Sequence, residues 1–293
     1  MEQPIKELRT AFLDARRDLA KDTLESYSYS LQSFVDFAKN RIQSIDDITE
    51  DMLKRYTAHL RTTKKCSATS IQQYVTILKL MLRWADHHVK YTYRMPSKDK
   101  KVIKLKRMNR WFTEEDVKRC LEYQFHVFHN RNHLMVRLMI ETGARVREIA
   151  QVETRDINAV KCTARIRESK TEPRTVFYSQ ETGKVFGLVI KDIKNAKMKG
   201  KDIKHIKIFP SVKQMKRIVS DMLIDLGLKN TKDGRGPHTF RHYCATYLHY
   251  MGGLSISDIG FLLGDTPDMI RSRYLHPTPE MLQGRMDQVW QRG

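Results

Sequence analysis

The most informative residues of this 293-residue chain are four polar side chains in its second half and middle. His238 and Arg241 stand three residues apart in PHTFRHYCATYLHYMG, a spacing that places an imidazole and a guanidinium on one face of a helix. Arg145 lies far upstream, and Tyr274 ends the later segment LLGDTPDMIRSRY. Two guanidiniums could bind one anion, and a phenol beside them could act as a covalent nucleophile.

The charge of the chain predicts a polyanionic partner. Lys and Arg total 54 against 34 Asp and Glu, which gives a formal net charge of +20. Neutralising phosphates releases their condensed counterions, so nucleic acid is the favoured partner. An anionic membrane surface is the rival, but no segment approaches the roughly 18 uninterrupted apolar residues of a spanning helix. Because the N-terminal segment is charged and lacks an apolar signal core, we expect a cytoplasmic protein.

The four cysteines predict neither a disulfide framework nor a metal site. Cys66, Cys120, Cys162 and Cys244 are widely separated and form no C-x-x-C pair. We expect small, buried thiols in a reducing compartment.

The elements before the chemistry-bearing residues read as an all-helical domain over residues 1–95. From Asp22 onward, apolar residues recur at three- and four-residue spacing, and further helices are expected after Thr49 and Ser67. Residues 96–110 begin at Pro96, are basic and lack helical periodicity, which predicts a phosphate-contacting linker. Thr113 with its following acidic residues then caps the first helix of a second domain, 111–293.

The second domain has mixed secondary structure. A buried helix is expected over 133–141, ended by Gly143, and alternating residues over 161–179 predict a two-stranded hairpin. We therefore predict a mainly α protein with a small β-sheet, in which an all-helical domain precedes an α+β domain. Further helices are expected at about 212–227, 238–251, 255–263, 267–274 and 279–290.

Three segments, in this order and spacing, resemble the phage integrase family of tyrosine recombinases. TGARVREIAQV resembles the first arginine box, PHTFRHYCATYLHYMG the second, and LLGDTPDMIRSRYLH the nucleophile box. The helical domain resembles the core-binding domain of the family more loosely. The resemblance implies an enzyme that cuts and rejoins duplex DNA through a 3′-phosphotyrosyl intermediate, without a metal or another cofactor.

The resemblance also implies a role for each residue. Arg145 and Arg241 would stabilise the negative charge of the pentacoordinate phosphorus, and Tyr274 would attack it. His238 would accept the phenolic proton and return it later. The plainer alternative is that His238 and Tyr274, like Tyr243, Tyr247 and Tyr250, are packing residues of amphipathic helices.

Two further positions match the family pattern. Lys170, in the turn of the predicted hairpin, would protonate the leaving 5′-oxygen, and Arg167 and Arg174 are the nearby alternatives. Glu148, three residues after Arg145, would orient that arginine rather than act on DNA.

Asp265 departs from the family, which usually has His or Trp after Leu-Leu-Gly. An ionised carboxylate accepts hydrogen bonds and repels a phosphate, so its presence raises the alternative of weakened or lost cleavage. We favour a capping role, in which Asp265 or Thr266 begins the helix that carries Tyr274.

The remaining features concern partners. Lysines from Lys191 to Lys207 form a basic insertion, either a DNA-tracking surface or a solvated loop. Leu282, Met286, Val289 and Trp290 share one face of a terminal helix that docks either on a neighbouring copy or on its own domain. The resemblance implies a tetramer on DNA, a monomer or dimer when free, and a nucleoid-associated location. A type IB topoisomerase is the third reading, because it shares an Arg, Lys, His and Tyr constellation.

Overall fold

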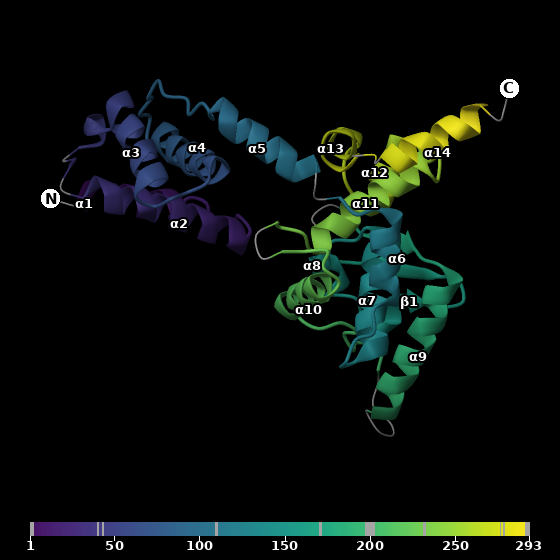
Figure 1. Cartoon of the computed structure of the whole chain (residues 1–293). Helices are drawn as coiled ribbons and strands as arrows, with labels where there is room; N and C mark the ends of the chain where they lie inside the picture. The colour runs from purple at the N-terminus through teal and green to yellow at the C-terminus, as the bar shows by residue number, and fades with distance from the viewer. Residues whose placement is uncertain are drawn as a thin grey trace. The chain divides into compact units, whose positions relative to one another are not determined.

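The chain forms two compact units, residues 1–104 and 105–293, each with a hydrophobic core of its own. The computed structural model describes residues 3–39, 41–42, 44–108, 111–169, 172–196, 203–230, 233–275, 277 and 279–290. The described chain is mainly helical, and a small sheet lies in the second unit, as Figure 1 shows. The predicted fold class is therefore confirmed.

The elements described in the first unit are all helices. Its core contains aromatic and aliphatic side chains such as Phe34, Tyr56 and Ile71, which the predicted amphipathic spacing brings together. The side chains of Thr49 and Ser67 accept hydrogen bonds from backbone amides and cap two of the helices, as predicted. The elements are α1 Gln3–Asp14, α2 Lys21–Ala38, η1 Ile45–Asp47, α3 Glu50–Thr62 and α4 Ala68–Trp84.

The basic segment expected to be an irregular linker is instead largely a helix, α5, from Ser97 to Met108. The expectation was wrong because many lysines obscure the apolar periodicity, whereas lysine itself is a good helix former. Near its start, Asp99 accepts a hydrogen bond from Arg61 of α3 at 2.9 Å. The segment thus begins as part of the first unit.

The second unit contains the predicted helices and hairpin. The side chain of Thr113 accepts from the amide of Asp116 and caps the first helix, as expected. The predicted hairpin is present, and a short additional strand extends it to an antiparallel sheet in the order β1-β2-β3. The elements are α6 Glu114–Glu122, α7 His129–Thr142, α8 Val146–Ile149, η2 Thr154–Asp156, β1 Ile157–Asn158, β2 Thr163–Ile166, β3 Arg174–Phe177, α9 Gln180–Ala196, α10 Val212–Asp225, α11 Pro237–Tyr250, α12 Ile256–Leu263, α13 Pro267–Met269, η3 Ile270–Tyr274 and α14 Pro279–Trp290.

Helix α7 is the centre of the second unit. It is apolar on most sides and packs against α6, α9 and α11 (Figure 1). It ends at Gly143, which adopts a left-handed conformation with φ of 59°. The chain therefore turns sharply after the helix, and Arg145 follows at the start of α8.

A smaller apolar cluster holds the segment that ends in Tyr274. Cys244 of α11, Leu263 of α12, Ile270 and Tyr274 are buried together in it. The predicted helix over 267–274 is present as α13 followed by η3, a short π-helical stretch. Because this cluster fixes the backbone on both sides of residue 265, it determines where the acidic and phenolic side chains point.

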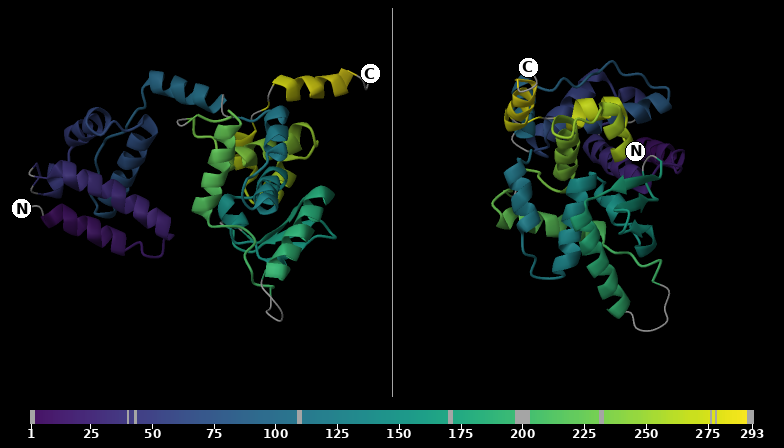
Figure 2. Two further views of the ribbon diagram at one scale, coloured as in Figure 1. Left: turned by 60° about the horizontal axis from the view of Figure 1, so that its bottom comes forward. Right: turned by 90° about the vertical axis from the view of Figure 1, so that its right-hand side faces the viewer.

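Two helices complete the unit. Helix α9 was not predicted, and Lys191 and Lys194 of the basic insertion lie on it, while lysines 197, 199 and 201 fall outside the described residues. Helix α14 lies at the periphery of this unit and contacts α11 (Figure 2). Within the described residues, no helix combines the length and apolar character that crossing a membrane requires.

Candidate active site

Arg145 is the residue directly before α8. Its backbone amide and its Nη1 both donate to the carboxylate of Glu148, at 2.8 and 2.9 Å. Its Nη2 donates to the carbonyl oxygen of Gly264 at 3.1 Å and to Oδ1 of Asp265 at 2.7 Å. The guanidinium thus links the start of α8 to the loop after α12.

Glu148 is buried, and its carboxylate holds Arg145 in place through these two hydrogen bonds. Its carboxylate also accepts two hydrogen bonds from Arg174 of β3, at 3.1 and 2.8 Å, and one from Ser169 at 2.9 Å. Burial by itself would raise the pKa of Glu148, but the bonds and charge of Arg174 and the amide of Arg145 outweigh it and lower that pKa to about 2. Glu148 is therefore ionised at neutral pH and contacts two arginines, which is consistent with its expected orienting role.

Arg241 is the most deeply buried charge of the site, with a side chain that is 1% exposed. Its Nη1 donates to the carbonyl oxygen of Gly143 at 2.7 Å, and its Nη2 donates to that of Leu263 at 2.9 Å. The same Nη2 lies 2.5 Å from Oδ2 of Asp265. The ends of α7 and α12 therefore hold this guanidinium in one orientation.

Asp265 lies between the two arginines. Of the two residues expected to cap the next helix, Asp265 is not the cap. Thr266 is the cap of α13, because its hydroxyl accepts from the amide of Met269 at 3.3 Å. Each carboxylate oxygen of Asp265 instead accepts a hydrogen bond from a different guanidinium. The carboxylate is the point on which Arg145 and Arg241 converge.

Tyr274 of the same chain also contacts the carboxylate of Asp265. Its hydroxyl donates to Oδ2 of Asp265 at 3.0 Å, and its ring lies 5.1 Å from the guanidinium carbon of Arg241. The ring is buried, and its backbone carbonyl accepts from the hydroxyl of Thr246 at 2.8 Å. Contacts within this chain thus hold the phenol beside Arg241 and against the carboxylate that both arginines contact.

Two imidazoles stand next to the phenol. The ring of His238 lies 5.7 Å from that of Tyr274, and His242, one turn later on α11, lies 4.8 Å from it. Partial desolvation of His238 and the like charges of Arg241 and Arg145 lower its pKa below 6.5, although one side of the ring still faces solvent. His242 was missed from the sequence, although its spacing of four residues from His238 predicts the same helix face.

Two basic residues of the hairpin, Arg174 and Arg167, are held in ion pairs. Arg174 is engaged with Glu148 and with the carbonyl oxygen of Leu262, and Arg167 pairs with Glu153 and Asp156. Neither side chain is therefore free to replace Lys170 as a proton donor. Lys170 itself lies outside the described residues, although Ser169 before it hydrogen-bonds Glu148.

Residues assigned to packing lie away from the convergence point. The rings of Tyr243 and Tyr247 stack at 5.6 Å on another face of α11, and Tyr250 lies near Arg285 of α14. All four cysteines are free thiols, and burial raises the pKa of both Cys120 and Cys244 to about 12. Cys120 and Cys244 are therefore inert thiols of the core, whereas Cys66 and Cys162 are only partly buried, which corrects the expectation of four buried thiols.

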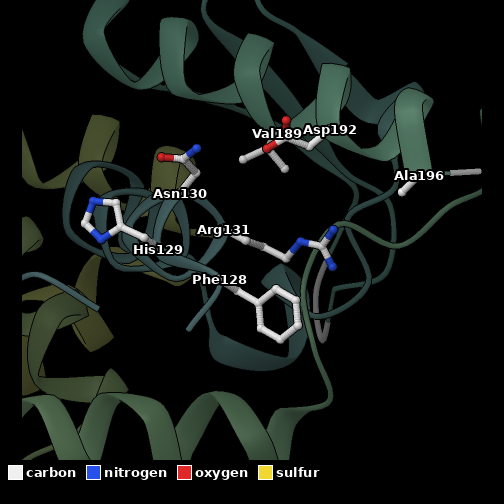
Figure 3. A pocket seen from close by; sticks show the side chains of 7 residues that line it. All are labelled: Phe128, His129, Asn130, Arg131, Val189, Asp192 and Ala196. Atoms are coloured by element: carbon white, nitrogen blue, oxygen red, sulfur yellow. The ribbon is translucent and has the colours of Figure 1, made fainter. Parts of the chain in front are cut away.

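A separate hollow lies between the start of α7 and the end of α9. Phe128 and Arg131 line one side of it, and Val189, Asp192 and Ala196 line the other (Figure 3). None of the residues predicted to carry chemistry borders it. The convergence at Asp265, rather than this hollow, is the candidate active site.

Comparison with known proteins identifies the family of the chain. The model of the phage integrase family matches residues 110–281, more than half of the chain, and a model of the phage integrase N-terminal SAM-like domain matches residues 6–88. The chain belongs to the phage integrase family. This family member is 24% identical to tyrosine recombinase XerA of Saccharolobus solfataricus, over 92% of this chain and 88% of that protein. It is 22% identical to tyrosine recombinase XerD of Staphylococcus epidermidis, over 93% of both.

Solved structures share the fold of this integrase-family chain at low identity. The Tn1549 transposon integrase in complex with transposon right end DNA has a TM-score of 0.70 at 15% identity, covering 98% of this chain and 99% of that one. XerH recombinase bound to its difH substrate in a post-cleavage complex has a TM-score of 0.68 at 17% identity, covering 95% and 83%. At such identities the likeness establishes the fold alone.

Proposed function

We propose that this chain is a site-specific DNA recombinase that cuts and rejoins duplex DNA through a covalent 3′-phosphotyrosyl intermediate on Tyr274. The observation that carries the proposal is the convergence of two guanidiniums and one phenol on a single carboxylate. An anion that offers one oxygen to each guanidinium suits this pair of donors, and a backbone phosphate presents two nonbridging oxygens. Membership of the phage integrase family and the DNA-bound recombinases that share the fold support the same reaction.

The reaction exchanges one phosphoester bond for another. The oxygen of Tyr274 forms a bond to phosphorus while the bond from phosphorus to the 5′-oxygen breaks, so the intermediate keeps the energy needed for rejoining. His238 accepts the phenolic proton, and Lys170 gives a proton to the leaving 5′-oxygen. Arg145 and Arg241 stabilise the charge that develops on the nonbridging oxygens, while Glu148 keeps Arg145 in place.

The contacts around Arg241 support its assignment in particular. Its Nη1 and Nη2 are aimed by two carbonyl oxygens at helix ends, so the guanidinium is fixed before any ligand arrives. Preorganised donors of this kind stabilise a transition state without reorganising during the reaction. A lysine at the same position would lack the planar fork, so we expect Arg241→Lys to lose cleavage.

The test is covalent capture from a pool of nicked duplexes with varied sequence. The protein should form adducts that survive denaturation, and sequencing of the captured DNA should show one preferred site. Tyr274→Phe should form no adduct, whereas Tyr247→Phe, a control on the surface of α11, should match the unaltered protein. Adduct formation that persists undiminished in Tyr274→Phe would remove this tyrosine from the mechanism.

Asp265 gives one observation in favour of a second function, a DNA-binding protein with weakened or lost cleavage. A carboxylate between the arginines opposes a phosphate, so this alternative predicts salt-sensitive DNA binding and no adduct from the nicked pool. A type IB topoisomerase would instead relax supercoiled plasmid that lacks any preferred site. Adducts confined to one sequence would reject both the loss of cleavage and the topoisomerase.

We further propose that the protein acts on double-stranded DNA as a homo-oligomer at the nucleoid. Leu282, Met286 and Trp290 of α14 are 46%, 48% and 73% exposed, which supports docking of this helix on a neighbouring copy. The side chain of Val289, the fourth member of the predicted apolar face, lies outside the described residues. Removal of residues 279–293 should then abolish higher assembly on DNA while leaving the arginine pair intact.

A further inference from the structure

We propose that Asp265 occupies the position of the scissile phosphate and must be displaced before the site can bind DNA. The inference rests on the proposed function, since it concerns the same two arginines and the same tyrosine. Its consequence is selectivity: a free phosphate ion is excluded, whereas a phosphate delivered by a bound duplex can replace the carboxylate. Asp265 is thereby a residue that controls entry of the substrate.

The contacts of the carboxylate reproduce those that a phosphodiester would make. Oδ1 accepts from Nη2 of Arg145 at 2.7 Å, and Oδ2 accepts from Nη2 of Arg241 at 2.5 Å. The hydroxyl of Tyr274 donates to the second oxygen at 3.0 Å. One oxygen for each guanidinium, with the phenol alongside, is the arrangement expected for two nonbridging oxygens beside an attacking group.

The charge balance makes simultaneous occupancy unfavourable. Glu148 already faces both Arg145 and Arg174, so Asp265 is the remaining anion that faces Arg241 among the described ion pairs. A phosphodiester entering beside the carboxylate would place two anions against the same donors, in a site where the carboxylate is 11% exposed and screening is weak. The two anions therefore compete.

Arg241 shows that the carboxylate does not satisfy the site fully. Its Nε is buried and has no acceptor within the described part of the chain, although both of its terminal nitrogens are engaged. A buried donor without an acceptor is costly, and a ligand with more acceptor oxygens would remove that cost. A phosphate has such an additional oxygen, whereas the carboxylate has both of its oxygens committed.

The backbone around Asp265 lets its side chain leave without unfolding an element. The residue stands between Gly264, which has a left-handed φ of 68° at the end of α12, and Thr266, which caps α13. Thr266, Pro267 and Asp268 are exposed, so solvent lies next to the loop. Rotation of one side chain toward this solvent would clear the arginine pair, while Tyr274 stays held by its buried ring.

The experiment measures the binding of inorganic phosphate to the full chain by calorimetry at low salt. Asp265→Asn keeps the size of the side chain but removes its charge, and we expect phosphate to bind roughly tenfold more tightly or better. Asp268→Asn is the matched control, because it removes one negative charge from an exposed position three residues away and should leave the affinity unchanged. Adding Arg145→Gln to Asp265→Asn should abolish the gain, which distinguishes this site from the many surface lysines.

Several results would overturn the proposal. One is the absence of any gain in phosphate affinity in both Asp265→Asn and Asp265→Ala, and another is an equal gain in Asp268→Asn. A third is weaker phosphate binding in the Asp265 variants, which would mean that Asp265 holds the arginines in place. If both Asp265 variants unfold, the unaltered protein still decides, because it should bind phosphate no better than Arg145→Gln does. A clear loss on Arg145→Gln alone would mean that the pair is already open.

Phosphate binding is independent of strand cleavage, so the two proposals can fail separately. Tighter binding in Asp265→Asn without any DNA adduct from the unaltered protein would support the competition and reject the recombinase. Adducts from the unaltered protein without a gain in Asp265→Asn would support the recombinase and reject the competition.

Discussion

At the scale of single residues, the site depends on a buried network in which one carboxylate serves two arginines. Glu148 accepts from Arg145 on one side and from Arg174 on the other, so helix α8 and strand β3 share one anion. Breaking a buried ion pair on one side leaves the other charge uncompensated. The network therefore positions Arg145 and also stabilises the fold.

Glu148→Gln should cost roughly 3 kcal/mol of unfolding free energy at neutral pH. The pKa of Glu148 falls from 4.5 to about 2 on folding, and each unit is worth about 1.4 kcal/mol. A lowered carboxyl pKa stabilises the fold above pH 4.5, and this contribution disappears as the pH falls toward 2. Denaturant unfolding of Glu148→Gln and of the exposed Glu168→Gln, measured at pH 7 and pH 3, tests this. Equal losses in the two variants at pH 7 would contradict the role of the network.

The lowered pKa of His238 predicts the acid side of the pH profile. The ring is neutral in the folded protein at pH 7, so it can accept a proton from Tyr274. Adduct formation should therefore stay level at neutral pH and fall only below pH 6.5, where the ring becomes charged. Folding stability should also decline there, because the unfolded chain binds the proton more readily.

Two histidine variants check this assignment. His238→Gln should lower the rate of adduct formation roughly 100-fold or more and remove the acid-side fall. His249→Gln, on the same helix but hydrogen-bonded to the carbonyl oxygen of Leu254, should keep both the rate and the profile. Persistence of the acid-side fall in His238→Gln would assign it to another group.

At the scale of elements, the ends of helices position the arginines. Gly143 ends α7 with φ of 59°, and its carbonyl oxygen accepts from Arg241 at 2.7 Å. A methyl group at this position would lie 3.2 Å from the sulfur of Cys244 and 3.3 Å from Leu263. The turn thus requires glycine for both conformation and space.

Gly143→Ala should destabilise the protein by roughly 1–2 kcal/mol, since a side chain disfavours the left-handed conformation. It should also weaken cleavage, because Arg241 loses its fixed acceptor. Gly187→Ala is the control: this glycine lies within α9, and an added methyl group meets no atom within 4 Å. That change should stabilise the protein by roughly 0.5–1 kcal/mol. Thermal unfolding of both variants gives the comparison, and a neutral Gly143→Ala would contradict the argument.

The sequence predicted those elements whose signals are local. Thr49, Ser67 and Thr113 cap helices where hydroxyl residues precede apolar periodicity, and the hairpin follows from alternation around residues 161–179. Helix α9 was missed although Phe186, Val189 and Ile193 lie on its buried face, because the lysines that follow suggested a loop. Helix α5 was missed because its many lysines obscure the apolar periodicity, although lysine itself is a good helix former.

Two kinds of signal predicted residues of the site: spacing along a helix, and the resemblance of three segments to the family's boxes, which named Arg145 and Tyr274. His238 and Arg241 share a face of α11, and Glu148 follows Arg145 within one helical turn, so these pairs could be read directly. Of the two cap candidates, Thr266 was right, but the contacts of Asp265 were missed because its partners, Arg145 and Arg241, are 120 and 24 residues away in sequence. Only the folded chain shows that a long-range ion pair wins over local capping.

At the scale of the whole molecule, all described residues of the site belong to the second unit. The first unit has its own apolar core, and its helices carry none of the residues expected to react with DNA. With a net charge of +20, both contact with DNA and its salt dependence follow from electrostatics. The proposed chemistry is therefore a property of the second unit.

In the proposed reaction, Tyr274 becomes covalently linked to a DNA backbone phosphate. The most direct measurement is mass spectrometry of the trapped adduct after digestion with nuclease and protease. We predict one modified peptide, with a nucleotide attached through its 3′-phosphate to Tyr274. A nucleotide on any other residue, or a linkage through a 5′-phosphate, would contradict the account.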